Sequence, residues 1–518
     1  MAKTPSENLF LLIKKMSGAE KRYFKLHIST HQKAESRSVT LFDAIVQSAE
    51  YDEVALKQIV YGEAVSSTKF TELKSFLYQE ILTSLTIFDA LMSVEFKLKN
   101  ALLHVRVLYK RGLYSACKGE LSKIKKTALR FEEFTILIEI LRWEKQIAYA
   151  ESNINYLAFE MQRIENEEET YLKKLENYII FKNTFYKVLA NVRQQEVQTH
   201  NTSILQDLEN LIADPLFASP ENALSHLAQV TYFRFMSLIS FARLDNERFY
   251  LYSKDLLQLM ESQPHFIAED ATEYISALSN FMKSCFAYEQ YDDALVYINK
   301  FQTIDAKTSD DRVKIQRQYY QSRFQLCVTT GQFEQGVIEV KNNLNSIQQF
   351  DSQLFSRSTF HFAYFYIYFG NGEYETALDY LNQWLMANKS VERQDLQVLS
   401  HLLNIMVHYE LGHTQLLESL MRSTYRVFRK NKQPFTIERK LLTFIKATQQ
   451  VRTRKELLKL FEDLKADFET LAREPKEAVI FLYFDFIAWL EAKTSNRTFA
   501  QVVQLRFEQK YKPLSATT

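Results

Sequence analysis

The stretch Gly372-Glu-Tyr374-Glu-Thr-Ala377-Leu378 lies between two amphipathic segments and has three near copies elsewhere in the chain. The copies are Gly112-Leu-Tyr114-Ser-Ala-Cys117, Gln290-Tyr291-Asp-Asp-Ala294-Leu and Gly331-Gln-Phe333-Glu-Gln-Gly336. From Tyr291 onward, the aromatic residues of these stretches follow one another after 42 and 41 residues. Self-similarity at such a period indicates an array of stacked helical pairs.

The surroundings of Tyr374 show how one unit is built. Residues 358–369 and 374–387 are predicted to form two helices, with a turn at 370–373. Glycines in that turn supply left-handed backbone angles without steric cost. We expect the aromatic residue at the start of the second helix to wedge between the pair. The small residue three positions later would let the two helices approach closely.

The composition favours helices along the whole chain. Only 9 glycines and 7 prolines occur among 518 residues, which is few for the turns of a sheet protein. Apolar residues make up 46% of the chain and recur at i, i+3, i+4 and i+7 in many segments. We therefore predict an all-α protein with long helices and short loops.

The sequence also constrains where in the cell the protein is located. No uncharged apolar run approaches the roughly 20 residues that cross a bilayer, and the N-terminus does not resemble a secretory signal. The three cysteines are odd in number and far apart, as is common in a reducing compartment. We expect a cytoplasmic protein with no membrane partner.

The repeated turn resembles that of the tetratricopeptide repeat, in which a Gly-x-Tyr-x-x-Ala-Leu core joins antiparallel helices. The matching residues are Gly112/Tyr114/Cys117, Tyr291/Ala294/Leu295, Gly331/Phe333/Gly336 and Gly372/Tyr374/Ala377/Leu378, with a weaker match at Gly412-His413-Thr414 and Leu417. Degenerate units fit at 152–156, near 201–203 and at 245–251. The resemblance implies a right-handed superhelical array of antiparallel helix pairs, an α-solenoid.

The chain departs from that family in two ways. Its period of roughly 41–47 residues exceeds the family's 34, so we expect each helix to be one or two turns longer. The glycine of the family's first helix is replaced by Val105, Met282, Phe324 or Phe365. HEAT-type repeats have a similar length and are the alternative assignment, but the Gly-x-Tyr turn favours the tetratricopeptide type.

The period divides the chain into three expected regions. Residues 97–430 form the array, with about eight helix pairs. Residues 1–96 form an N-terminal helical module that caps the array or resembles a helix-turn-helix, with helices expected at 5–15, 18–30, 40–49, 52–61 and 67–95. Residues 431–518 form a C-terminal cap with three or four helices. This layout resembles peptide-sensing bacterial regulators, in which a helical module precedes a repeat array.

Motifs for catalysis or for cofactors are not found. The chain has no glycine-rich phosphate loop, no nucleophile elbow and no metal-ligand spacing. Cys285, Cys327 and His408 share one core-facing position relative to the turn, so we interpret them as core residues. We predict no catalytic residue, no cofactor and no metal, and therefore not an enzyme.

Charge is unevenly distributed although the net charge is only +1. Residues 97–130 carry +9, residues 131–421 carry −16 and residues 422–459 carry +10. The second basic band includes a candidate patch of Arg422, Arg426, Arg429, Lys430, Lys432, Arg452, Arg454 and Lys455. Such a patch could bind nucleic acid, the chain's own acidic middle, an acidic protein or a second copy of the chain.

The resemblance also implies a binding groove, because the first helix of each tetratricopeptide pair lines the concave face. The corresponding residues are Ser279, Lys283, Phe286, Gln318, Gln321, Gln325, Thr359, Phe362, Tyr366 and Phe369. Amides beside aromatic rings suit an extended peptide or a helix; alternatively, Phe362 and Tyr366 pack against a neighbouring repeat. We expect a non-catalytic scaffold that binds a protein or peptide partner. The alternative is a regulator that contacts nucleic acid through 97–130 and 422–459.

Overall fold

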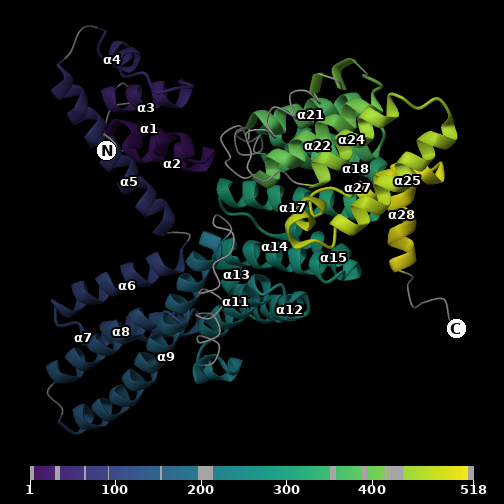
Figure 1. The fold of residues 1–518 in the computed structure, drawn as a ribbon. Helices are drawn as coiled ribbons and strands as arrows, with labels where there is room; N and C mark the ends of the chain where they lie inside the picture. The colour runs from purple at the N-terminus through teal and green to yellow at the C-terminus, as the bar shows by residue number, and fades with distance from the viewer. Residues whose placement is uncertain are drawn as a thin grey trace. The chain divides into compact units, whose positions relative to one another are not determined.

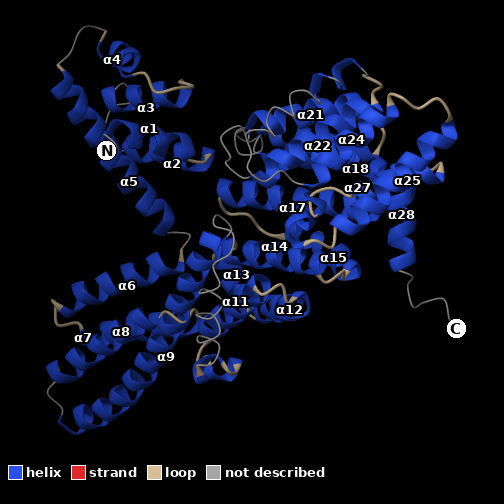
Figure 2. Ribbon diagram, in the orientation of Figure 1, coloured by secondary structure: helices blue, strands red, loops and turns tan. Residues whose placement is uncertain are grey.

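The structure is a computed structural model that describes residues 5–29, 36–62, 66–90, 93–151, 154–195, 214–349, 358–387, 394–413, 415–417, 419–420 and 436–511. Within these ranges every regular element is a helix, and no strand occurs (Figure 2). The predicted all-α class is therefore confirmed. In the same part of the chain, no helix combines the length and apolar character needed to span a membrane.

The chain divides into two compact units. The first comprises Met1–Ala294 with Ile304–Arg312, and the second comprises Leu295–Thr303 with Val313–Thr518. The division falls inside the predicted array of residues 97–430, whose own boundaries stay a prediction. Each unit is described separately below.

The first unit begins with five helices around a core of their own. Phe24, Phe42 and Phe70 are fully buried in this core. The expected helix at 67–95 ends earlier, and a new helix begins at Val94, where the backbone N–H donates to Glu269 at 2.6 Å. The five helices are α1 (Pro5–Lys15), α2 (Gly18–Ser29), α3 (Arg37–Gln47), α4 (Glu53–Tyr61) and α5 (Ser67–Ala90).

The rest of the first unit is a succession of helices in which neighbours along the chain pack together (Figure 1). One helix, α9, has 42 residues, which is well beyond the one or two extra turns expected. The elements are α6 (Val94–Tyr109), α7 (Tyr114–Arg130), α8 (Phe134–Ala150), α9 (Ile154–Gln195), η1 (Pro215–Phe217), η2 (Pro220–Asn222), α11 (His226–Ala242), α12 (Asn246–Ser262), α13 (Pro264–Glu269), α14 (Thr272–Ala287) and the start of α15 (Tyr291–Ile298).

The second unit surrounds one large core rich in phenylalanine and tyrosine. Its C-terminal part contains five described helices where three or four were expected. The elements are α16 (Lys300–Thr303), α17 (Ser309–Thr330, from Val313 on), α18 (Phe333–Ser346), η3 (Ile347–Gln349), α20 (Ser358–Gly370), α21 (Tyr374–Ala387), α22 (Gln394–Glu410), α24 (Thr436–Thr448), α25 (Arg454–Leu471), α26 (Pro475–Phe481), α27 (Phe486–Ser495) and α28 (Phe499–Lys510).

The repeated turn has the geometry that its sequence predicts. Gly112, Gly331, Gly372 and Gly412 all take positive φ between 70° and 82°. In the turn after α20, the N–H of Glu373 donates to the carbonyl of Tyr368 at 2.9 Å, which closes the end of the helix as in a Schellman motif. Ala377 is fully buried three residues after Tyr374, so the small residue lies at the helix contact as expected.

The same turn also occurs where the sequence has no glycine. Glu132, Leu244 and Glu289 take φ of 54°, 58° and 60°, and each is followed by the same backbone hydrogen bond. A left-handed residue with a side chain costs roughly 1 kcal/mol. At Glu132 the side chain offsets this cost, because its carboxylate accepts hydrogen bonds of 2.8 Å from the N–H groups of His226 and Leu227, at the start of α11.

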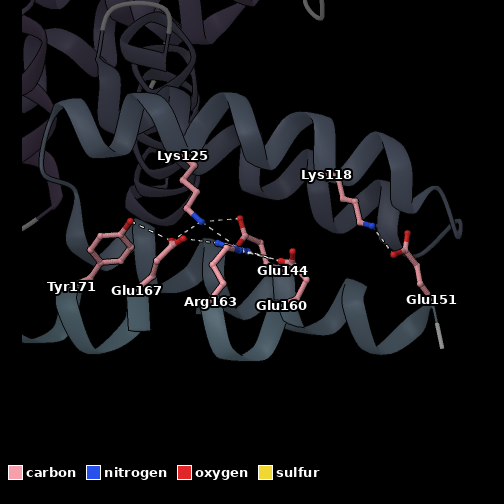
Figure 3. A network of polar contacts seen from close by, with 8 residues as sticks. All are labelled: Lys118, Lys125, Glu144, Glu151, Glu160, Arg163, Glu167 and Tyr171. Carbon is pink, nitrogen blue, oxygen red and sulfur yellow. Dashed lines mark hydrogen bonds and ion pairs between the residues drawn. The ribbon is translucent and has the colours of Figure 1, made fainter. Parts of the chain in front are cut away.

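An ion-pair network joins α7, α8 and α9 (Figure 3). Arg163 on α9 contacts Glu144 on α8 at 2.6 Å and Glu167 one turn along its own helix at 2.5 Å. Lys125 on α7 reaches the same two carboxylates, at 3.1 and 2.7 Å. Because each side chain contacts several partners, the conformational entropy lost in ordering it is smaller per contact than in an isolated surface pair. The network therefore fixes three helices side by side.

Gly372 and Gly331, with similar φ values of 82° and 73°, provide a matched test of the turn. We expect Gly372→Ala to cost about 1–2 kcal/mol, because a Cβ there meets nothing within 4 Å and only the positive φ is strained. Gly331→Ala should cost about 1–3 kcal/mol more, since its Cβ would lie 2.8 Å from the Gln504 nitrogen of α28. Urea denaturation followed by circular dichroism measures both. Equal losses would contradict this account of Gly331.

Candidate functional site

Four of the predicted groove residues line one cavity in the second unit. Gln321 and Gln325 lie on α17, and Phe362 and Tyr366 lie on α20. The cavity has a volume of about 690 Å³. The helical register borrowed from the tetratricopeptide turn thus brings residues of two successive first helices to the same hollow.

The remaining groove residues lie elsewhere. Phe369 is fully buried in the core of the second unit, and Gln318 is half-buried outside the cavity lining. On α14 of the first unit, Ser279 is buried, Lys283 is exposed and the half-buried ring of Phe286 lies 6.3 Å from that of Tyr291. Thr359 belongs to α20, but its side chain is outside the described part of the structure.

The walls of the cavity differ in chemistry. Along α17, the two glutamine amides are followed by Val328 and Thr329. Aromatic rings from α17, α20 and α21 also line the cavity, among them Phe324, and the ring of Phe362 lies 5.0 Å from that of Trp384 on α21. Amide groups facing aromatic rings offer hydrogen bonds beside apolar contact area, which is the usual composition of a peptide-binding pocket.

The C-terminal segment 481–485, which runs from the last residue of α26 to the residue before α27, also lines the cavity. The ring of Phe484 lies 4.6 Å from that of Tyr366, whose hydroxyl accepts a hydrogen bond of 3.0 Å from the N–H of Asp485. Burial, with the nearby Asp485 carboxylate, raises the pKa of Tyr366. The hydroxyl therefore stays neutral and holds the segment against α20.

Contacts from helix α28 hold the segment 481–485 in place. The rings of Phe499 and Phe484 are stacked with centroids 5.6 Å apart. Arg506 contacts Asp485 at 3.1 Å and also pairs with Glu491, while Gln504 donates to the carbonyl of Gly331 at 3.1 Å. The C-terminal helices therefore form part of the cavity.

Sequence reasoning missed the contribution of residues 481–485. It assigned the C-terminal region to a cap and searched for groove residues only on the first helices of the repeats. The run Phe481-Leu-Tyr-Phe-Asp-Phe486 was the available signal, because so many aromatic residues before a helix need a surface to pack on. Which surface that is depends on tertiary structure.

The basic patch is only partly described. Arg452, Arg454 and Lys455 are exposed at the start of α25, and Arg454 donates to Asn496 at 3.3 Å. The other predicted patch residues lie outside the described residues; they are Arg422, Arg426, Arg429, Lys430 and Lys432. No geometry of the complete patch follows.

In the first basic band, several charges already have partners within the first unit. Four of its ten lysines and arginines form ion pairs, so they are less available to phosphate groups. Two of these pairs cross to other helices: Lys118 contacts Glu151 at 2.5 Å, and Lys125 contacts Glu167 at 2.7 Å.

The residues interpreted as core residues are buried. Cys285, Cys327 and His408 are at most 8% exposed. The carbonyls of Cys285 and His408 accept the hydrogen bond that closes their turns. Burial raises the pKa of Cys285 to about 12 and that of Cys327 to about 11. Among the described residues, no group of three metal-ligating side chains was found.

The thiols provide a direct test of this packing. Because Cys117, Cys285 and Cys327 are buried and their thiol pKa values are raised, we expect none to react with a disulfide reagent at pH 8 in the folded protein. All should react after unfolding in urea. The release of coloured thiolate measures the reaction, and rapid labelling of the folded chain would show that the repeat register is wrong.

Comparison with models of known protein families, with curated proteins and with solved structures found no match.

Proposed function

We propose that the chain is a non-catalytic scaffold of the tetratricopeptide-like α-solenoid type, acting in the cytoplasm. Its task would be reversible binding of a peptide or helix from a partner protein. The cavity bounded by α17, α20 and the segment 481–485 is the proposed docking site. No cofactor enters this mechanism.

The main support is that this surface already binds a peptide segment, which belongs to the chain itself. Residues 481–485 pass over α20 with a backbone N–H bonded to Tyr366 and with Phe484 against an aromatic wall. This is the mode in which a groove captures a peptide through main-chain hydrogen bonds and side-chain pockets. A partner segment would extend the same arrangement along the free part of the cavity.

Leu482 marks the open side of the cavity. It lines the cavity and is 84% exposed, the highest value among the large apolar side chains that the structure describes. Covering an exposed leucine with a partner stabilises the complex by about 25 cal/mol per Å² of apolar surface removed from water. The amides of Gln321 and Gln325 would bond the backbone of the bound segment.

A selection experiment tests the proposal. The full chain is used to enrich ligands from a random peptide library, and binding of the enriched peptides is measured by fluorescence anisotropy. We expect apolar or aromatic peptides whose affinity falls about tenfold in Leu482→Gln, since the lost apolar contact is worth roughly 1–2 kcal/mol. The folded state should persist, because this side chain is exposed.

Ile338→Gln is the matched control. Ile338 lies on α18 of the same unit, is 49% exposed and does not line the cavity. Its substitution should leave peptide affinity unchanged. Equal affinity in parent and Leu482→Gln, or equal loss in both variants, would reject the cavity as the docking site.

A second candidate function is contact with nucleic acid through 97–130 and 422–459. It is favoured by the exposure of three closely spaced cations, Arg452, Arg454 and Lys455, at the start of α25. Phosphate contacts by such a group release counterions, so binding would weaken steeply with salt.

A gel-shift titration with duplex DNA and with RNA tests this second function. If it is correct, the complex forms at low salt and is lost as salt rises. The triple variant Arg452→Ala/Arg454→Ala/Lys455→Ala should then weaken binding for all sequences alike. Absence of a complex at low salt would eliminate the nucleic-acid function and leave the scaffold function untouched.

A further inference from the structure

The first unit contains a larger cavity, of about 980 Å³, whose lining is strongly acidic. Ten carboxylate side chains line it, among them Glu95, Glu133 and Glu269, against three cationic ones, Lys182, Arg234 and Lys307. The sequence placed most of the chain's negative charge between residues 131 and 421, and the fold gathers part of it here. A cavity with this excess of carboxylates attracts cations.

Some of these carboxylates have structural tasks. Glu269 accepts from the N–H of Val94 at the start of α6, and Asp270 accepts from the N–H of Thr272 at the start of α14. Glu273 pairs with Arg234. The exposed Glu95 pairs with Lys99 one turn along α6, and a bound guanidinium would share this carboxylate with it. The contacts of Glu269, Asp270 and Glu273 explain three acidic residues without any ligand.

Glu133 has no such task. Within the described residues its carboxylate forms neither a hydrogen bond nor an ion pair, although the residue is half-buried at the start of α8. Burial raises its pKa most, the like charges of Glu95 and Glu269 add to the effect, and the positive charge of Lys99 opposes it in part. The ionised form of Glu133 is therefore disfavoured on balance, because the attraction to Lys99 does not outweigh burial and the like charges.

His226 provides an independent observation. It lines the cavity at the start of α11 and is only 7% exposed. Its ring is stacked on Phe266 with centroids 4.8 Å apart, and its Nδ1 has no hydrogen-bond partner in the described part of the chain. A buried ring nitrogen without a partner is costly unless a ligand satisfies it.

The cavity also contains an internal example of how it holds a cation. The guanidinium of Arg234 lies over the ring of Phe185, 4.9 Å from its centroid, and pairs with Glu273. A cation between an aromatic face and a carboxylate gains from both. Glu133 stands near a comparable aromatic surface, because Phe131 precedes it in the turn and also lines the cavity.

We propose that this cavity binds an arginine-rich peptide segment of a partner protein, with guanidinium groups held between the carboxylates of Glu133 and Glu95 and the aromatic wall. Guanidinium groups match the planar, bidentate geometry of carboxylates and stack on rings. The volume accommodates several side chains of such a segment, whereas a single small cation would leave most of it empty. This site is separate from the docking site proposed on the second unit.

The test uses the full chain and a short fluorescent peptide of alternating arginine and serine. A peptide with citrulline in place of arginine is the neutral counterpart, and spermine is the small-cation competitor. We expect the arginine peptide to bind at least about tenfold more tightly than the citrulline peptide, as expected for a close charge pair. Similar affinity for both peptides would overturn the proposal.

Two variants locate the site. Glu133→Gln should weaken binding of the arginine peptide about tenfold while leaving the melting temperature unchanged or raised, because it removes a half-buried charge that its surroundings disfavour. Glu95→Gln, at an exposed position, should weaken binding too and serves if the first variant is impaired in folding. Glu139 lies on α8, which begins directly after Glu133, but outside the cavity lining. Glu139→Gln makes the same change of charge and should alter affinity less than about twofold.

Equal weakening by Glu139→Gln and Glu133→Gln would mean diffuse attraction to an acidic surface, and would overturn the cavity as the site. Displacement of the peptide by spermine at equal charge concentration would overturn the choice of a peptide over a small cation. The peptides selected on the second unit should be unaffected by Glu133→Gln, so the two proposals fail separately.

Discussion

Many of the helix pairs depend on one backbone constraint, a residue in the left-handed conformation followed by an N–H that returns to the preceding helix. This hydrogen bond uses a carbonyl that the helix end would otherwise leave unpaired. It also sets the direction in which the next helix leaves. Because the turn is repeated along the chain, the aromatic residue and the small residue after it reach the same helix contact in unit after unit, as Ala377 and Ala294 show.

Glycine is the cheapest residue for this conformation, but the chain does not always use it. At Gly331 the missing side chain has a second role, since α28 approaches too closely to admit a Cβ. At Glu132 a side chain is useful, because it caps the start of α11 across 94 residues of sequence. The same backbone conformation thus closes the end of a helix at every such turn, and at Glu132 it also positions a side chain that caps a helix far along the chain.

Both candidate sites arise where distant segments meet. In the second unit, the C-terminal residues 481–485 complete a cavity begun by α17 and α20. In the first unit, the starts of α6, α8 and α14 bring carboxylates to one hollow, and the start of α11 adds His226. Acidic residues are favoured at helix starts, where they accept from unpaired N–H groups. Gathering several such starts therefore concentrates negative charge. In the part of the chain that the structure describes, the carboxylate of Glu133 and the Nδ1 of His226 have no hydrogen-bond partner there.

The sequence by itself determined the all-α class, the period of the turn, and the burial of Cys285, Cys327 and His408, because these follow from spacing within one or two helices. The register taken from the tetratricopeptide resemblance placed Gln321, Gln325, Phe362 and Tyr366 in one groove, with packing against a neighbouring repeat left open for Phe362 and Tyr366; these four residues line one cavity. Only the tertiary structure decided that Phe369 is in the core, that residues 481–485 cover Tyr366, and that Glu133 faces other carboxylates. Such contacts join residues far apart in the chain, where local periodicity carries no information about distance.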